Sequence, residues 1–83
     1  MTDFEIKVSR ILEDIGDMLI AKNKAYGDSA LNPVRVFSDT ATDEQLNVRI
    51  DDKLSRIRNG DTSEDVVSDL IGYLVLKKIK ELE

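Results

Sequence analysis

Apolar residues recur at every third or fourth position near the start of the chain, and no other feature of the sequence limits the fold more. Thr2 and Glu5 precede most of them as a capping box, in which each side chain accepts a hydrogen bond from the other's backbone N–H. The pattern predicts an amphipathic helix of about six turns that ends near Lys24. The series is Phe4, Val8, Ile11, Leu12, Ile15, Met18 and Leu19, continued by Lys22.

Two further helices are predicted downstream. Residues 42–58 begin with a second capping box, Thr42 to Gln45, and stop before Asn59-Gly60, a pair that favours a helix C-terminus. The third helix is expected to begin around residues 61–64 and to run to the C-terminus. Apolar residues at helical spacing mark both segments: Leu46, Ile50, Leu54 and Ile57 in the first, and Val66, Val67, Leu70, Ile71, Leu74, Val75 and Leu82 in the second.

The connection between the first two helices is long. Residues 25–41 contain the only proline, Pro33. Loops of this length in compact domains are usually functional or disordered. We expect Leu31 and Phe37 to anchor this loop on the body of the protein.

The size and composition of the chain restrict both its stability and its chemistry. A chain of 83 residues makes a single domain, residues 1–83, and buries only about 60% of the surface of its unfolded form. It has no cysteine and no histidine, which excludes disulfides, zinc sites built on those residues, and Ser-His-Asp or Cys-His catalysis. We therefore expect an all-α fold of three antiparallel helices, completed by homo-oligomerisation into a helical bundle.

The charge of the chain limits its partners. Its net charge is −5, the wrong sign for a protein that binds long nucleic acid through a basic face. A small nucleotide is permitted, because a local cluster of cations is enough to bind it. No apolar run is long enough to cross a membrane, and the first residues do not resemble a signal peptide. The sequence therefore predicts a cytoplasmic protein.

A stripe of charged residues lies beside the apolar face of the predicted second helix. Arg49, Asp52, Lys53 and Arg56 follow one another at i, i+3, i+4 and i+7, which places them on one helix face. Arginine offers a planar fork to phosphate oxygens and lysine a point charge, so this stripe is a candidate phosphate site. The alternative is a solvated face with ordinary ion pairs, worth a few tenths of a kcal/mol each.

Two carboxylates, Asp65 and Asp69, lie one turn apart near Gly72 and Tyr73. Like charges at this spacing repel, so we expect a metal ion or the cations of the second helix to compensate. For Asp65 the alternative is a first-turn acid that the helix dipole favours. A glycine inside a helix costs about 1 kcal/mol relative to alanine. Gly72 is therefore expected to permit the close approach of a helix or a ligand.

The end of the first predicted helix combines several groups that suit a nucleotide. Lys22 and Lys24 are cations in the last helical turn, which the helix dipole alone would explain. Tyr26 can stack on a base, and Gly27 allows close backbone approach. The spacing is not that of a P-loop, so this segment is either a nucleotide-binding element or an ordinary turn.

Three segments together resemble the nucleotide modification associated domain type 1 family, over about residues 20–77. That family is common in bacteriophages and is related to the MazG-like all-α nucleoside triphosphate pyrophosphohydrolases. The segments are KNKAYGDS at 22–29, RIDDKLSRI at 49–57 and EDVVSDLIGY at 64–73.

The resemblance implies a helical, oligomeric protein that handles nucleotides with a Mg²⁺ ion held by carboxylates between helices. Asp52, Asp65 and Asp69 match the family's metal positions. Lys53 and Arg56 match phosphate contacts, and Tyr26 with Lys22 would lie at the base or ribose end. The full set expected to contact a nucleotide is Lys22, Tyr26, Gly27, Arg49, Lys53, Arg56 and Tyr73.

The sequence leaves three functions open. The first is a Mg²⁺-dependent pyrophosphohydrolase, although Ser55 stands where those enzymes carry a second acid and no residue is assigned as catalytic. The second is a phage-type binding protein that sequesters a nucleotide immune signal, of the cyclic or ADP-ribose type, without turnover. The third is a helical bundle that only mediates protein interactions.

Overall fold

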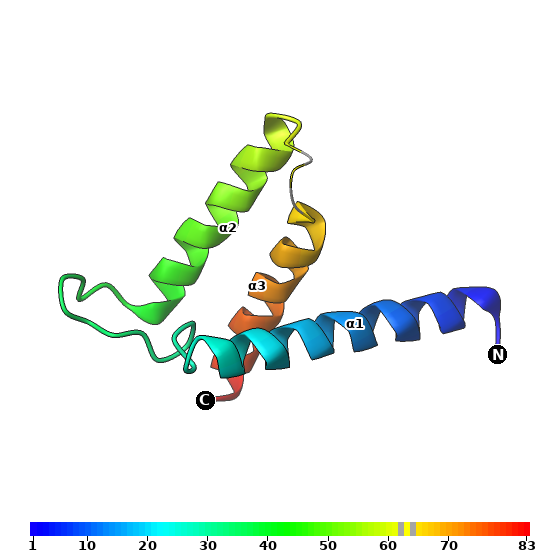
Figure 1. Ribbon diagram of the computed structural model, residues 1–83, viewed down its shortest axis with the longest axis horizontal. Coiled ribbons are helices and arrows are strands. Elements are labelled where there is room, and N and C mark those ends of the chain that lie inside the picture. Colours follow the sequence, from blue (N-terminus) through cyan, green and yellow to red (C-terminus); the bar gives the residue numbers. More distant parts are fainter. Residues whose placement is uncertain (62, 64) are drawn as a thin grey trace.

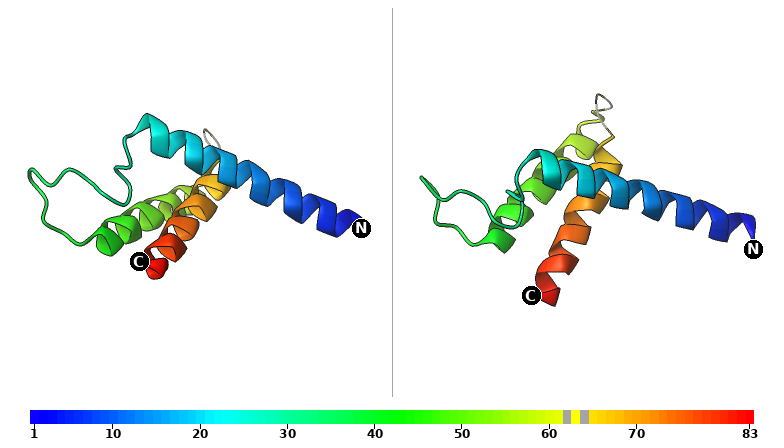
Figure 2. Two further views of the ribbon diagram at one scale, coloured as in Figure 1. Left: turned by 90° about the horizontal axis from the view of Figure 1, so that it is seen from below. Right: turned by 60° about the horizontal axis from the view of Figure 1, so that its bottom comes forward.

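The computed structural model describes residues 1–61, 63 and 65–83, and within them the chain forms three α-helices and no strand. The helices are α1 (Asp3–Ala25), α2 (Thr42–Arg58) and α3 (Val66–Leu82). Helices α2 and α3 lie side by side as an antiparallel hairpin (Figure 1). Helix α1 crosses this hairpin near its own C-terminal end, and its N-terminal half extends away from the body (Figure 2).

The all-α fold is thus confirmed, with one difference in the arrangement. Helices α2 and α3 are antiparallel neighbours, as expected, whereas α1 contacts α3 at a crossing instead of lying along the pair. The structure describes one chain, so completion of a bundle by a second copy stays a prediction. No helix in the described part of the chain has the length and apolar character needed to cross a membrane.

The helix ends show which local signals determine the fold. Helix α1 begins as predicted, because the Thr2 hydroxyl accepts a hydrogen bond from the Glu5 backbone N–H at 3.1 Å. The capping box predicted at Thr42 is wrong, since Ala41 occupies the cap position and makes no side-chain cap. The Thr42 hydroxyl instead accepts from the Arg35 guanidinium at 2.9 Å, which ties the loop to the start of α2.

Helix α3 begins later than the sequence suggested. Its N-cap is Asp65, whose carboxylate accepts from the Ser68 backbone N–H at 3.0 Å. Asp61 forms a separate turn, in which its carboxylate accepts from the Ser63 backbone N–H at 2.8 Å. Two residues of the predicted start, Thr62 and Glu64, lie outside the described residues.

The buried core is small. Among the described residues only Ile15, Leu46 and Val66 are buried apolar side chains, and each comes from a different helix. Gly72 is also buried, where α1 crosses α3. The prediction that Gly72 permits close approach is therefore confirmed for a helix: a Cβ at this position would lie 3.2 Å from atoms of the Met18 and Leu19 side chains.

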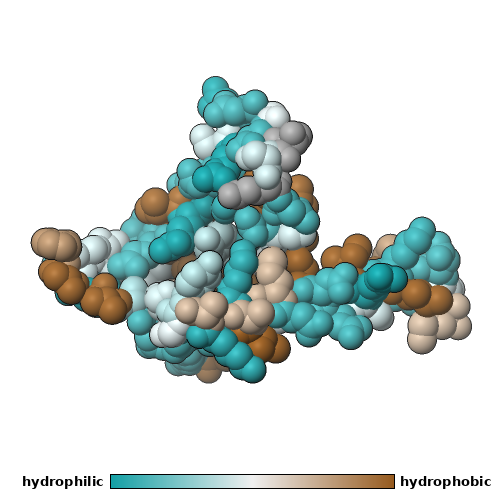
Figure 3. Space-filling model, in the orientation of Figure 1, coloured by the Kyte–Doolittle hydropathy of each residue, from teal (hydrophilic) through white to brown (hydrophobic). Residues whose placement is uncertain are grey.

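The loop between α1 and α2 is held only in part. Leu31 is half-buried, as expected of an anchor. Phe37 is fully exposed, so its predicted role as an anchor is wrong. Arg35 instead fastens this end of the loop, by donating to the Thr40 carbonyl and to Thr42. Exposed apolar side chains are visible on the loop and along the projecting part of α1 (Figure 3).

The two helical glycines provide a matched test of the crossing. A Cβ at Gly16 would meet no atom within 4 Å, unlike one at Gly72. We expect Gly16→Ala to raise the free energy of unfolding by about 1 kcal/mol, because alanine favours a helix. Gly72→Ala should raise it less, since Met18 and Leu19 must shift. Urea denaturation measures both variants, and equal gains would contradict the close packing of α1 on α3.

Candidate functional site

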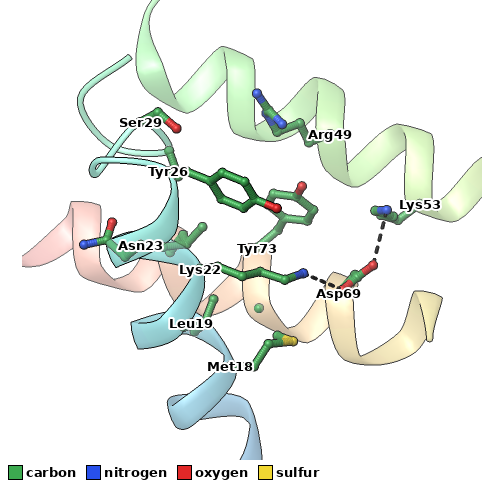
Figure 4. A pocket seen from close by; sticks show the side chains of 13 residues that line it. Met18, Leu19, Lys22, Asn23, Tyr26, Ser29, Arg49, Lys53, Asp69 and Tyr73 are labelled. Atoms are coloured by element: carbon green, nitrogen blue, oxygen red, sulfur yellow. Dashed lines mark hydrogen bonds and ion pairs between the residues drawn. The ribbon is translucent and has the colours of Figure 1, made fainter. Parts of the chain in front are cut away.

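A cavity of about 560 Å³ lies between the three helices, beside the point where α1 crosses α3. Helix α1 and the turn after it form one wall, and α2 and α3 form the others (Figure 4). The cavity has a charged part and an aromatic part. Its lining residues are Met18, Leu19, Lys22, Asn23, Tyr26, Ser29, Ala30, Arg49, Lys53, Asp69, Gly72, Tyr73 and Leu76.

The charged part is organised around Asp69 of α3. One carboxylate oxygen lies 3.3 Å from the Lys22 ammonium on α1, and the other lies 3.4 Å from the Lys53 ammonium on α2. The side chains of Asp69 and Lys53 are only 18% and 11% exposed, so water screens this pair weakly. A single carboxylate therefore links all three helices and fixes two ammonium groups at the cavity.

The aromatic part brings together two residues that are far apart in the sequence. Tyr26 follows the last turn of α1, and Tyr73 lies one turn after Asp69 on α3. Their rings project toward the same space in Figure 4, with the Arg49 side chain of α2 on the opposite wall. The cavity thus presents two flat apolar surfaces beside a guanidinium group.

The local charge of the cavity is opposite to that of the chain. Lys22, Arg49 and Lys53 contribute three positive charges and Asp69 one negative charge, which leaves a net charge of +2 on the lining residues. The chain as a whole carries −5. A cavity of this sign within an acidic protein attracts small anions while the rest of the surface repels long polyanions.

Five of the seven residues expected to contact a nucleotide line this one cavity. They are Lys22, Tyr26, Arg49, Lys53 and Tyr73. The other two, Gly27 and Arg56, are not among the lining residues. The Gly27 backbone turns the chain out of α1 with φ +62°, and the Arg56 guanidinium lies 3.4 Å from the carboxylate of Asp52, one turn earlier on α2.

The three carboxylates expected to hold Mg²⁺ have separate surroundings. Asp65 caps α3, Asp52 pairs with Arg56 at the surface, and Asp69 contacts two lysines. Within the described part of the chain, no three acidic side chains lie close enough together to hold a metal ion. For Asp69, compensation by a cation of α2 is confirmed, with Lys53 as that cation. The Mg²⁺ ion itself stays a prediction.

The cavity also contains side chains that the sequence does not mark individually as ligand contacts, among them Asn23, Ser29, Met18 and Leu19. Asn23 and Ser29 belong to the segment 22–29 that was singled out, and each adds a polar group to the cavity. Met18 and Leu19 were assigned to the apolar face of the first helix. Their part in the cavity depends on where α1 crosses α3, which helical periodicity does not specify.

The fold and the cavity define an all-α protein with a cationic and aromatic site between its helices. Comparison of the chain with protein-family models, curated proteins and solved structures gives no match in any of the three. The family resemblance therefore stays a prediction, and a function has to be inferred from the cavity.

Removing the charge of Asp69 tests its role in holding the helices together. We expect Asp69→Asn to lower the free energy of unfolding by about 1–2 kcal/mol, because two ammonium groups lose a weakly screened carboxylate. Asp52→Asn is the matched control, since the Asp52 side chain is 59% exposed and its ion pair with Arg56 lies within one helix. Asp52→Asn should lower the free energy of unfolding by no more than about 0.5 kcal/mol. Equal losses in urea denaturation would contradict the structure.

Asp65 gives a separate prediction about acid stability. Hydrogen bonds from the Ser68 hydroxyl and then its backbone N–H hold the pKa of Asp65 below the usual 3.8. Because the pKa of Asp65 is lower in the folded state than in the unfolded state, the ionised carboxylate stabilises the fold at pH values above the usual pKa. This contribution is lost as the pH falls through the pKa of the folded state. Asp65→Asn keeps a good N-cap but does not titrate. We expect its melting temperature to fall less than that of the wild type on acidification below about pH 4, as measured by circular dichroism.

Proposed function

We propose that this protein binds a small phosphorylated nucleotide in the cavity between its three helices. The observation that supports the proposal is the meeting of Lys22, Arg49 and Lys53 with the rings of Tyr26 and Tyr73 around one space. Its volume of about 560 Å³ falls in the usual range for small-molecule sites. Cations beside aromatic rings match the two ends of a nucleotide, its phosphates and its base.

The phosphate end would lie at Arg49 and the two lysines. Arg49 supplies a planar fork for two phosphate oxygens, and the lysines supply point charges. Asp69 keeps Lys22 and Lys53 close together in the absence of an anion. With a net charge of +2, the lining residues would neutralise a ligand that carries two phosphate charges.

The base end would lie between Tyr26 and Tyr73. Base–aromatic stacking is worth about 1–3 kcal/mol per base and accepts any base, since every base has a flat face. Selection among bases then depends on hydrogen bonds. Asn23 and Ser29 are the neutral polar side chains other than tyrosine that line the cavity, so the proposal gives them this role.

Binding without turnover fits these contacts better than hydrolysis. Hydrolysis of a triphosphate would need Mg²⁺ near the phosphates, and Asp69 would have to exchange at least one lysine for the ion. A ligand with two phosphate charges, such as a cyclic dinucleotide or an ADP-ribose-type molecule, needs no such exchange. The favoured activity is therefore sequestration by a cytoplasmic homo-oligomer, with a Mg²⁺-dependent pyrophosphohydrolase as the alternative.

A thermal-shift screen followed by chromatography tests the proposal. The ligands are nucleoside mono-, di- and triphosphates, cyclic dinucleotides and ADP-ribose, each with and without Mg²⁺. We expect a rise in melting temperature with a ligand of two phosphate charges, recovered intact. Conversion of a triphosphate to monophosphate and pyrophosphate would establish the enzyme instead. A screen without any shift would leave only an interaction bundle.

Two substitutions locate the binding site by isothermal titration of the best ligand. Arg49→Ala should weaken binding at least about tenfold through loss of a charged hydrogen bond. Tyr26→Leu should weaken it about tenfold through loss of stacking. Arg58→Ala is the control, because Arg58 lies in the last turn of the same helix and does not line the cavity. Unchanged affinity in both cavity variants would exclude this site.

A further inference from the structure

The N-terminal half of α1 carries an apolar face that the rest of the chain leaves uncovered. Phe4, Ile11 and Leu12 are 75%, 54% and 60% exposed. They continue the stripe that packs on α3 further along the same helix, where Ile15 is only 6% exposed. Figure 1 shows this half of α1 projecting from the body. One continuous apolar stripe is thus buried at one end and open to water at the other.

We propose that a second copy of the chain packs against this face, with its own α1 antiparallel. The amount of exposed surface supports a partner of this kind. The chain exposes 6475 Å², whereas a folded monomer of 9.4 kDa should expose about 5,000 Å². The excess of roughly 1,500 Å² exceeds the roughly 800 Å² that each partner buries in a standard interface.

The shape of the chain supports the same conclusion. Its radius of gyration is 14.5 Å, compared with about 12 Å for a compact domain of this length. The longest dimension is 48 Å, and the projecting half of α1 lies along it (Figure 1). An amphipathic helix extended in this way gains stability only if its apolar face is covered.

The spacing of the stripe favours pairing of α1 with a second α1. Phe4, Val8, Ile11, Ile15 and Met18 follow one another at alternating steps of four and three, which is the seam of a coiled coil. In an antiparallel pair the axis of symmetry would pass between Val8 and Ile11. Val8 would then face the partner's Ile11, and Phe4 would reach the point where the partner's α3 covers the buried Ile15 of that copy.

The charge at the end of the seam decides between the two directions. The next position of the seam is Lys22, whose ammonium group contacts Asp69 at the cavity. Parallel helices would bring Lys22 close to the same residue of the partner, and like charges in the seam repel. Antiparallel helices separate the two lysines and place the two bodies at opposite ends of the dimer.

Matched isoleucines on opposite faces of α1 test the proposal. Ile11 and Ile6 are 54% and 50% exposed, but only Ile11 lies in the stripe. By light scattering with size-exclusion chromatography, the wild type and Ile6→Glu should have twice the 9.4 kDa mass of one chain. Ile11→Glu should weaken association at least a hundredfold, because two charges would be buried. Circular dichroism should show unchanged helix content, since the Ile11 side chain is more than half exposed within its own chain.

Two results would overturn the proposed interface. One is a wild type that stays monomeric up to about 1 mM, a concentration at which even weak interfaces associate. The other is an equal effect of Ile6→Glu and Ile11→Glu. Neither depends on a nucleotide, so failure of the binding proposal leaves this one standing, and the reverse also holds.

The direction of the helices has its own measurement. The chain has no cysteine, so a nitroxide label can be attached specifically to Asp3→Cys. Antiparallel pairing should separate the two labels by about 20 Å along the helix axis, from the rise of 1.5 Å per residue. Parallel pairing would bring them to about 10 Å, the usual distance between packed helices. Pulsed and continuous-wave electron paramagnetic resonance distinguish the two, and the short distance would contradict the antiparallel arrangement.

Discussion

The carboxylate of Asp69 is the contact on which the arrangement of the three helices depends. It accepts Lys22 of α1 on one oxygen and Lys53 of α2 on the other, while the apolar core beneath contains few buried side chains. Two ammonium groups held this close would repel each other without it. The same carboxylate therefore positions α1 over the hairpin and shapes the cationic part of the cavity. Stability and ligand recognition share one group, so a substitution there alters both.

A local signal in the sequence was sufficient to predict the start of α1. The spacing of Thr2 and Glu5 favours Thr2 as the cap over its neighbour Asp3, and Thr2 does cap the helix. Several polar residues in succession precede α3, and all but Glu64 are of types that cap helices. The choice of Asp65 follows from the burial of Val66 directly after it, which is a tertiary contact. At α2 the tertiary contact of Arg35 with Thr42 replaced the expected cap.

In the candidate site, too, some residues could be predicted from local patterns and others depend on how the helices pack. Helical periodicity placed Arg49 and Lys53 on one face of α2, and both line the cavity. Arg56 lies one turn further along that face, beyond the residues that α1 and α3 bring to the cavity, and pairs with Asp52 instead. Periodicity describes the direction of a side chain from its own helix but not the length of helix that a neighbour covers. That length depends on the crossing of α1 at Gly72, which only the folded chain reveals.

Helix α1 connects the two proposals through its two halves. Its C-terminal half contributes Lys22 and the lining side chains Met18 and Leu19, and this half crosses α3 (Figure 1). Its N-terminal half carries the uncovered stripe around Ile11. A partner that holds the N-terminal half reduces the freedom of the whole helix, and a ligand bound at Lys22 does so from the other end. Where both events order the same element, each lowers the entropic cost of the other, and thermodynamic linkage makes the effect reciprocal. A dimer joined through α1 would therefore bind its nucleotide more tightly than the isolated chain does.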